Sequence, residues 1–168
     1  MTKPNPVVLV ILTVVTIFLG VDGARAQTVR QETLNLEGAR TILHAAEEKA
    51  RAIRKPSCIA IVDVGGHLLL FERMEGAWLA GDDLALGKAH SAALFGKPTA
   101  KLEDAINGGR TAAVTAGAVE MQGGVPVTVR GVVVGAIGVS GSDKDGDVPV
   151  VEAGSAAVSP PADKDTEH

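Results

Sequence analysis

The stretch SCIAIVDVGGHLLLFE, residues 57–72, is the part of the sequence that predicts the fold most directly. Residues 57–64 are mostly β-branched and apolar, which predicts a strand. The pair Gly65-Gly66 supplies a two-residue turn that tolerates positive φ, and residues 67–72 predict the returning strand. The stretch is therefore expected to form a β-hairpin. Cys58, the only cysteine, is expected to be a small buried residue of the first strand, and a lone cysteine excludes an intramolecular disulfide.

Helical spacing appears on both sides of this hairpin. Residues 36–53 carry apolar side chains at helical intervals, and Asn35 precedes them as a candidate N-cap. Residues 82–95 are rich in Ala and Leu and end at Gly96, a residue typical of helix ends. A shorter helix is predicted over residues 99–106. The hairpin is thus expected to be flanked by at least three helices.

The second half of the chain predicts three more strands and a last helix. The strands are expected at residues 119–122, 125–129 and 132–140, each of which begins with Val, and Arg130-Gly131 is expected to form the turn between the last two. Asp147 is expected to cap a final helix with Pro149 near its first turn. The fold class predicted from this order is α+β, with a five-stranded antiparallel sheet flanked by helices.

A glycine-rich segment, GVVVGAIGVSG at residues 131–141, has neither the spacing of a dinucleotide-binding loop nor that of a hydrolase nucleophile turn. Recurring glycines in a strand indicate that another backbone, or a flat ligand, approaches closely. We expect Gly135, Gly138 and Gly141 to mark such an approach.

The two ends of the chain differ from this domain. Lys3, an apolar run at residues 7–21 and the small-residue site Ala24-Arg25-Ala26 have the order of a cleavable secretory signal. The sequence therefore predicts a signal peptide at 1–26, a secreted or periplasmic protein, one domain at 27–158, and a disordered Pro-rich, charged tail at 159–168.

Composition excludes one class of partner. The formal net charge is −4, there is no tyrosine, and the chain has one tryptophan and three phenylalanines. A negative surface repels phosphate backbones, and few aromatic side chains are present to stack on bases. Nucleic acid is therefore not an expected ligand.

Metal-binding patterns are weak. The histidines of the domain are not spaced as a helical zinc pair, although each is a candidate single axial ligand for haem iron and, alternatively, a solvated or core residue. Glu72 and Glu75 form an E-x-x-E pattern whose oxygens suit ferric iron, with surface charge as the plainer interpretation.

Several segments, taken in order, resemble one known family. They are VDVGGHL at 62–68, ERMEGA at 72–77, KA at 88–89, FGKPT at 95–99, GGVP at 123–126 and GVVVGAIGVSG at 131–141. In this order they are similar to the GlcG/HbpS-like haem-binding family, also called the haem-degrading domain family, over about residues 34–158. One departure is SDKDGD at 142–147, where the family usually has a more acidic start to its last helix.

The resemblance implies a profilin-like α/β sandwich, homo-oligomers and haem binding, with haem degradation or iron binding in some members. It also implies that an exported member can sense haem and signal to a membrane sensor protein, or sequester iron. A small-molecule binder or enzyme accessory in a catabolic pathway is the alternative function. The candidate haem contacts are axial ligands His67, His90, His44 and, last, Thr111, together with Lys88 and Arg110 as cations for the propionates.

Overall fold

The computed structural model describes residues 27–141 and 144–158. The predicted signal peptide at 1–26 and the predicted disordered tail at 159–168 lie outside the described residues. The chain divides into two units, Met1–Gln31 and Glu32–His168, and every described helix and strand belongs to the second. Among the described residues, no helix has the length and apolar character needed to cross a membrane.

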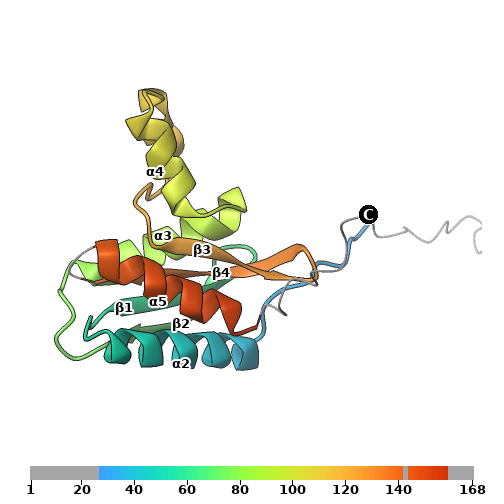
Figure 1. Ribbon diagram of the computed structural model, residues 1–168. Coiled ribbons are helices and arrows are strands. Elements are labelled where there is room, and N and C mark those ends of the chain that lie inside the picture. Colours follow the sequence, from blue (N-terminus) through green and yellow to red (C-terminus); the bar gives the residue numbers. More distant parts are fainter. Residues whose placement is uncertain (1–26, 142–143, 159–168) are drawn as a thin grey trace, which may run out of the picture. The chain divides into compact units, whose positions relative to one another are not determined.

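The second unit is an α+β domain built on one antiparallel sheet (Figure 1). Its strands are arranged in the order β2-β1-β4-β3, so the hairpin β1–β2 lies beside the hairpin β3–β4. The elements in chain order are α2 (Leu36–Ala52), β1 (Cys58–Asp63), β2 (Leu68–Arg73), α3 (Gly81–Phe95), α4 (Thr99–Asn107), the 3-10 helix η1 (Thr111–Ala116), β3 (Gly124–Val129), β4 (Val132–Ser140) and α5 (Lys144–Ala156).

The sheet has four strands, and the prediction of five was wrong. Residues 119–122 form no strand, because their backbone is bonded to helix side chains and not to a sheet neighbour. The N–H of Val119 donates to Ser91 Oγ at 2.8 Å, and the N–H of Gln122 donates to Glu103 Oε2 at 2.7 Å. The residues therefore form a strap that ties α3 to α4.

The turn of the second hairpin follows the sequence prediction. The first hairpin does not have the expected two-residue Gly65-Gly66 turn, because four residues separate β1 from β2 and the Gly66 N–H donates to the Asp63 carbonyl at 3.0 Å. Gly66 has φ of 80°, and the pair Arg130-Gly131 has φ of 50° and 78°. Positive φ at both central residues gives the twist that closes a two-residue hairpin. Pro126 lies in β3, which is an edge strand of the sheet and can accommodate a residue without an N–H.

One face of the sheet is covered by α2 and α5. The predicted cap of α2 is confirmed, because the side chain of Asn35 accepts the Gly38 N–H at 2.8 Å. The core on this side is made of branched aliphatic residues that the sheet and the two helices share. They include Ile42 of α2, Ile59 and Ile61 of β1, Ile137 and Val139 of β4, and Val150 and Val151 of α5.

The opposite face is covered by α3 through small side chains. Ala85 and Ala89 are buried against Ala60, and Gly138 of β4 lies beneath the helix. A Cβ added at Gly138 would lie 2.5 Å from the Ala89 N and would also meet the Ala85 carbonyl. The glycine therefore permits the backbone approach that the sequence predicted.

Helix α5 differs from its prediction. It begins at Lys144, so Pro149 lies inside the helix, and Asp147 is not its N-cap. Asp147 is buried and accepts the Gly141 N–H through Oδ1. Its Oδ2 accepts a hydrogen bond from Lys88 of α3, and this bond holds the carboxylate in the interior.

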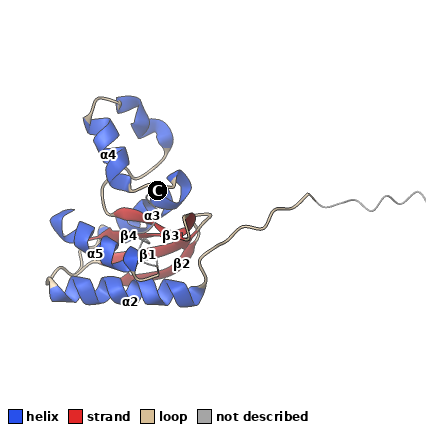
Figure 2. Cartoon of the chain, turned by 45° about the vertical axis from the view of Figure 1, so that its right-hand side comes forward, coloured by secondary structure: helices blue, strands red, loops and turns tan. Residues whose placement is uncertain are grey.

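The segment formed by α4 and η1, residues 99–116, is called the arm here. It extends away from the sheet in both views (Figures 1 and 2). Its root is fixed by Thr99, which is fully buried and whose Oγ1 accepts the Gly124 N–H at 2.9 Å. No residue of η1 is buried, so the arm carries little core of its own.

Candidate functional site

A pocket of about 350 Å³ lies where the arm meets the end of α3 and the strap. We call it the arm pocket. Its walls are largely apolar, and its volume falls within the range of small-molecule sites. It is lined by Phe95, Lys97, Leu102, Ala105, Arg110, Ala112, Ala113, Thr115, Ala116, Ala118 and Glu120.

Two cations line this apolar pocket. Lys97 follows the end of α3, whereas Arg110 immediately precedes η1, and both are exposed. Neither has an ion pair or a side-chain hydrogen bond within the part of the chain that the structure describes. Both are therefore available to a carboxylate at the mouth of an otherwise apolar site. Arg110 was predicted as a ligand cation, and Thr111 lies next to it as the exposed first residue of η1.

Glu120 is the only acidic residue that lines the arm pocket. Its Oε1 is shielded from solvent and is the one buried side-chain oxygen or nitrogen among the described residues that has no hydrogen-bond partner. Val119 and Gln122 on either side are anchored by Ser91 and Glu103, so the backbone that carries Glu120 is held in place. Glu120 lies in the strap, which was predicted to be a strand, and Lys97 lies in the segment FGKPT, which carries the family resemblance but was not predicted to contact a ligand.

The three histidines of the described residues lie away from the arm pocket. His67 is 83% exposed, and its Nδ1 is 3.3 Å from Asp63 Oδ1. His90, on α3, places its Nδ1 3.1 Å from the Gly66 carbonyl oxygen, so both rings flank the β1–β2 turn. His44 lies on the exposed side of α2, with Nδ1 3.8 Å from Glu48 Oε1. None of them is among the residues that line the arm pocket.

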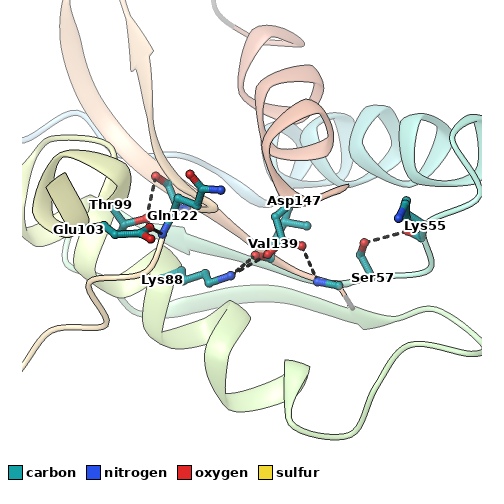
Figure 3. A network of polar contacts seen from close by, with 10 residues as sticks. Lys55, Ser57, Lys88, Thr99, Glu103, Gln122, Val139 and Asp147 are labelled. Carbon is teal, nitrogen blue, oxygen red and sulfur yellow. Dashed lines mark hydrogen bonds and ion pairs between the residues drawn. The ribbon is translucent and has the colours of Figure 1, made fainter. Parts of the chain in front are cut away.

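Lys88 is not at a surface. It is 2% exposed, and its Nζ donates to Asp147 Oδ2 at 2.8 Å and to the Val139 carbonyl at 3.0 Å (Figure 3). These bonds join α3, β4 and α5. An ammonium held in this way does not fit the role of a propionate partner that the sequence suggested for it.

The two glutamates of the E-x-x-E pattern have different surroundings. Glu72 is half-buried on β2 and lies close to Glu47 of α2, whereas Glu75 is exposed in the loop after β2. Desolvation, followed by the nearby charge of Glu47, raises the pKa of Glu72. The Arg51 guanidinium, which bonds Glu47, lowers the pKa of that neighbour. Among the described residues, no group of three or more His, Cys, Asp or Glu side chains is arranged to hold a metal ion.

Comparison with known proteins identifies the family. Residues 34–156 match the family model described as haem degrading protein HbpS-like. GlcG of Escherichia coli K12 is 40% identical over 108 residues, which are 64% of this chain and 81% of GlcG.

Two solved structures share the fold. A double mutant of Streptomyces reticuli HbpS is 30% identical with a TM-score of 0.73, covering 83% of this chain and 97% of that one. A PduOC–haem complex is 27% identical with a TM-score of 0.68, covering 75% of this chain and 95% of that one. Because both its sequence and its fold match, the chain belongs to the HbpS-like family of haem degrading proteins.

Proposed function

We propose that this chain is an exported haem-binding protein and that the arm pocket is its porphyrin site. The observation that carries the proposal is an apolar pocket bordered by two cations, Lys97 and Arg110, that have no partner in the described structure. The PduOC–haem complex, a structure with the same fold, supports haem as the ligand.

The residues of the pocket fit a haem group. Phe95, Leu102 and the alanines of η1 offer an apolar wall for the porphyrin plane. Lys97 and Arg110 would hold the propionate carboxylates by charge-assisted hydrogen bonds. Glu120 provides an oxygen that the protein itself leaves unpaired. When bound, haem supplies a redox-active iron.

Haem titration tests the proposal. The wild-type protein is expected to give a Soret shift that saturates at a fixed stoichiometry. The double variant Lys97→Gln with Arg110→Gln is expected to bind haemin about ten-fold or more weakly, since two charge-assisted contacts are removed. Lys101→Gln, which removes an exposed charge from α4 but does not line the pocket, is the matched control.

The histidines provide the competing site in the same experiment. If haem binds beside the β1–β2 turn, His67→Ala and His90→Ala will weaken binding and shift the Soret band, while the double cation variant will bind like wild type. His44→Ala is expected to change neither. An unchanged haem spectrum with wild-type protein would contradict haem binding and favour a small-molecule binder or accessory protein of a catabolic pathway.

Export and assembly belong to the same proposal. The order of Lys3, the apolar run and the Ala24-Arg25-Ala26 site supports cleavage after Ala26. Mass spectrometry of protein recovered from the periplasm or medium is expected to give a chain beginning at Gln27. A chain recovered only with residues 1–26 intact would contradict the export part alone. We further propose that the protein is a homo-oligomer that can contact a membrane sensor protein.

A further inference from the structure

We propose that Glu120 offers a carboxylate oxygen to the iron of a porphyrin in the arm pocket, and so makes the pocket selective for ferric haem over metal-free porphyrin. The inference rests on the proposed haem function and names the residue that would contact the iron. It starts from the single orphaned oxygen found in the described interior, which belongs to a residue lining the pocket.

The strap makes Glu120 a fixed part of the pocket wall. On its N-terminal side, Val119 is bonded to Ser91, which is 1% exposed. On its C-terminal side, the Gln122 N–H bonds Glu103, and Gly124 bonds the buried Thr99 (Figure 3). An anchored backbone need not be ordered when the carboxylate that it carries meets a ligand.

The charge of Glu120 is poorly compensated without a ligand. Its Oε1 receives no hydrogen bond, and no ion pair joins Glu120 to a cation of the described structure. A carboxylate with one oxygen shielded from water and without a partner attracts a positive charge more strongly than a fully solvated one does. A cation brought into the pocket would therefore be stabilised beside this side chain.

The other residues of the arm pocket offer no comparable iron ligand. The lining contains no histidine, cysteine or methionine. Lys97 and Arg110 are cations without a free acceptor, and the Thr115 hydroxyl already donates to the Ala112 carbonyl at 2.8 Å. Carboxylate oxygen is a hard ligand of the kind that ferric iron accepts. Glu120 is thus the group of this wall with the charge and the chemistry to meet the metal.

Two porphyrins separate a metal contact from a general binding role. Ferric protoporphyrin IX and metal-free protoporphyrin IX are titrated into wild type, Glu120→Gln and Asp104→Asn, followed by absorbance and by fluorescence quenching. Glu120→Gln keeps the size of the side chain and removes its charge. Asp104→Asn removes a charge from exposed α4 outside the pocket and is the matched control. Circular dichroism and thermal melting establish that each variant is folded.

We expect Glu120→Gln to lower the affinity for ferric protoporphyrin IX about ten-fold and to shift its Soret band, with less than about a two-fold change for the metal-free ring. Asp104→Asn is expected to match wild type with both. Equal weakening of both ligands, or no change with either, would overturn the inference while leaving haem binding intact. Failure of wild type to bind ferric protoporphyrin IX would instead overturn the proposed function. If Glu120→Gln does not fold, Glu120→Asp, which retracts the same carboxylate, must show the same selective loss.

Discussion

Lys88 Nζ lies 2.8 Å from Asp147 Oδ2, and the two side chains are 2% and 5% exposed. The pair joins the helix on one face of the sheet to a helix on the other (Figure 3). Removing one partner of a buried pair leaves the other charge uncompensated, whereas removing both does not.

Lys88→Met is therefore expected to lower the free energy of unfolding by about 3 kcal/mol or more, measured by urea denaturation. The double variant Lys88→Met with Asp147→Leu should lose less than the sum of the two single variants. Arg130→Gln, which breaks the exposed pair with Glu32, serves as the control and should cost about 1 kcal/mol or less. A Lys88→Met protein as stable as wild type would contradict a structural role for the pair.

Gly138→Ala is expected to destabilise the protein by about 2 kcal/mol or more, because the added Cβ meets the backbone of α3. Gly65→Ala is the comparison, since its Cβ would meet side-chain atoms of the exposed His67 and of Asp63, which can shift, and no backbone. Thermal unfolding of both variants measures the difference. Equal melting temperatures would show that α3 is not packed on β4 as closely as described.

The Cys58 thiol gives a pH-dependent prediction. Desolvation, then the bond to Asp82 at 3.2 Å, raises its pKa from 9.0 to about 12. The folded state thus holds the thiol proton more tightly than the unfolded state does. This contribution is complete below about pH 9 and is lost as the pH rises towards about 12. Urea midpoints at pH 8, 9 and 10 should fall more steeply for wild type than for Cys58→Ala, and parallel slopes would refute the shift.

Iron binding by the E-x-x-E pattern is a separate prediction. Glu72→Ala with Glu75→Ala is expected to weaken ferric-ion binding and leave the circular dichroism spectrum unchanged, because Glu75 is exposed and Glu72 only half-buried. Isothermal titration with a ferric chelate measures it, and Glu37→Ala with Glu152→Ala, two exposed carboxylates elsewhere, is the control. Identical iron binding by both double variants would rule the pattern out.

Sedimentation velocity tests the proposed oligomer. Leu86 and Leu94 of α3 are 36% and 56% exposed, and two exposed leucines at positions i and i+8 on one helix side are expected to pack against another copy. Leu94→Lys should shift the distribution towards monomer at micromolar concentration, whereas Lys101→Glu should not. A wild-type protein that is already monomeric at this concentration would contradict the expectation.

Local sequence patterns were enough to predict most of the fold. The hairpin of β1 and β2, helix α2 with its Asn35 cap, and the Arg130-Gly131 turn each depend on residues close together in the chain. The strap is a segment for which the local pattern predicted the wrong structure. Its valine-containing segment resembles a strand, yet Ser91 and Glu103, distant in sequence, take its backbone hydrogen bonds.

The candidate site was predicted less well for the same reason. Arg110 was found from its charge, but Lys97 and Glu120 matter only because the arm folds back to make a pocket between them. Lys88 looked like a surface cation from its helix position, and only the tertiary contact with Asp147 accounts for its burial. Residues whose role depends on contacts 20 or more positions away carry no local signal.

The two edge strands of the sheet, β2 and β3, differ in their capacity to pair with another strand, and this limits how copies of the domain can polymerise. Strand β3 contains Pro126, which has no N–H to offer to a further strand, whereas β2 contains no proline. Head-to-tail stacking, in which β2 of one copy extends β3 of the next, is therefore disfavoured. Pairing through backbone hydrogen bonds is expected to join β2 to β2 about a two-fold axis, which gives a closed pair and not a growing fibril.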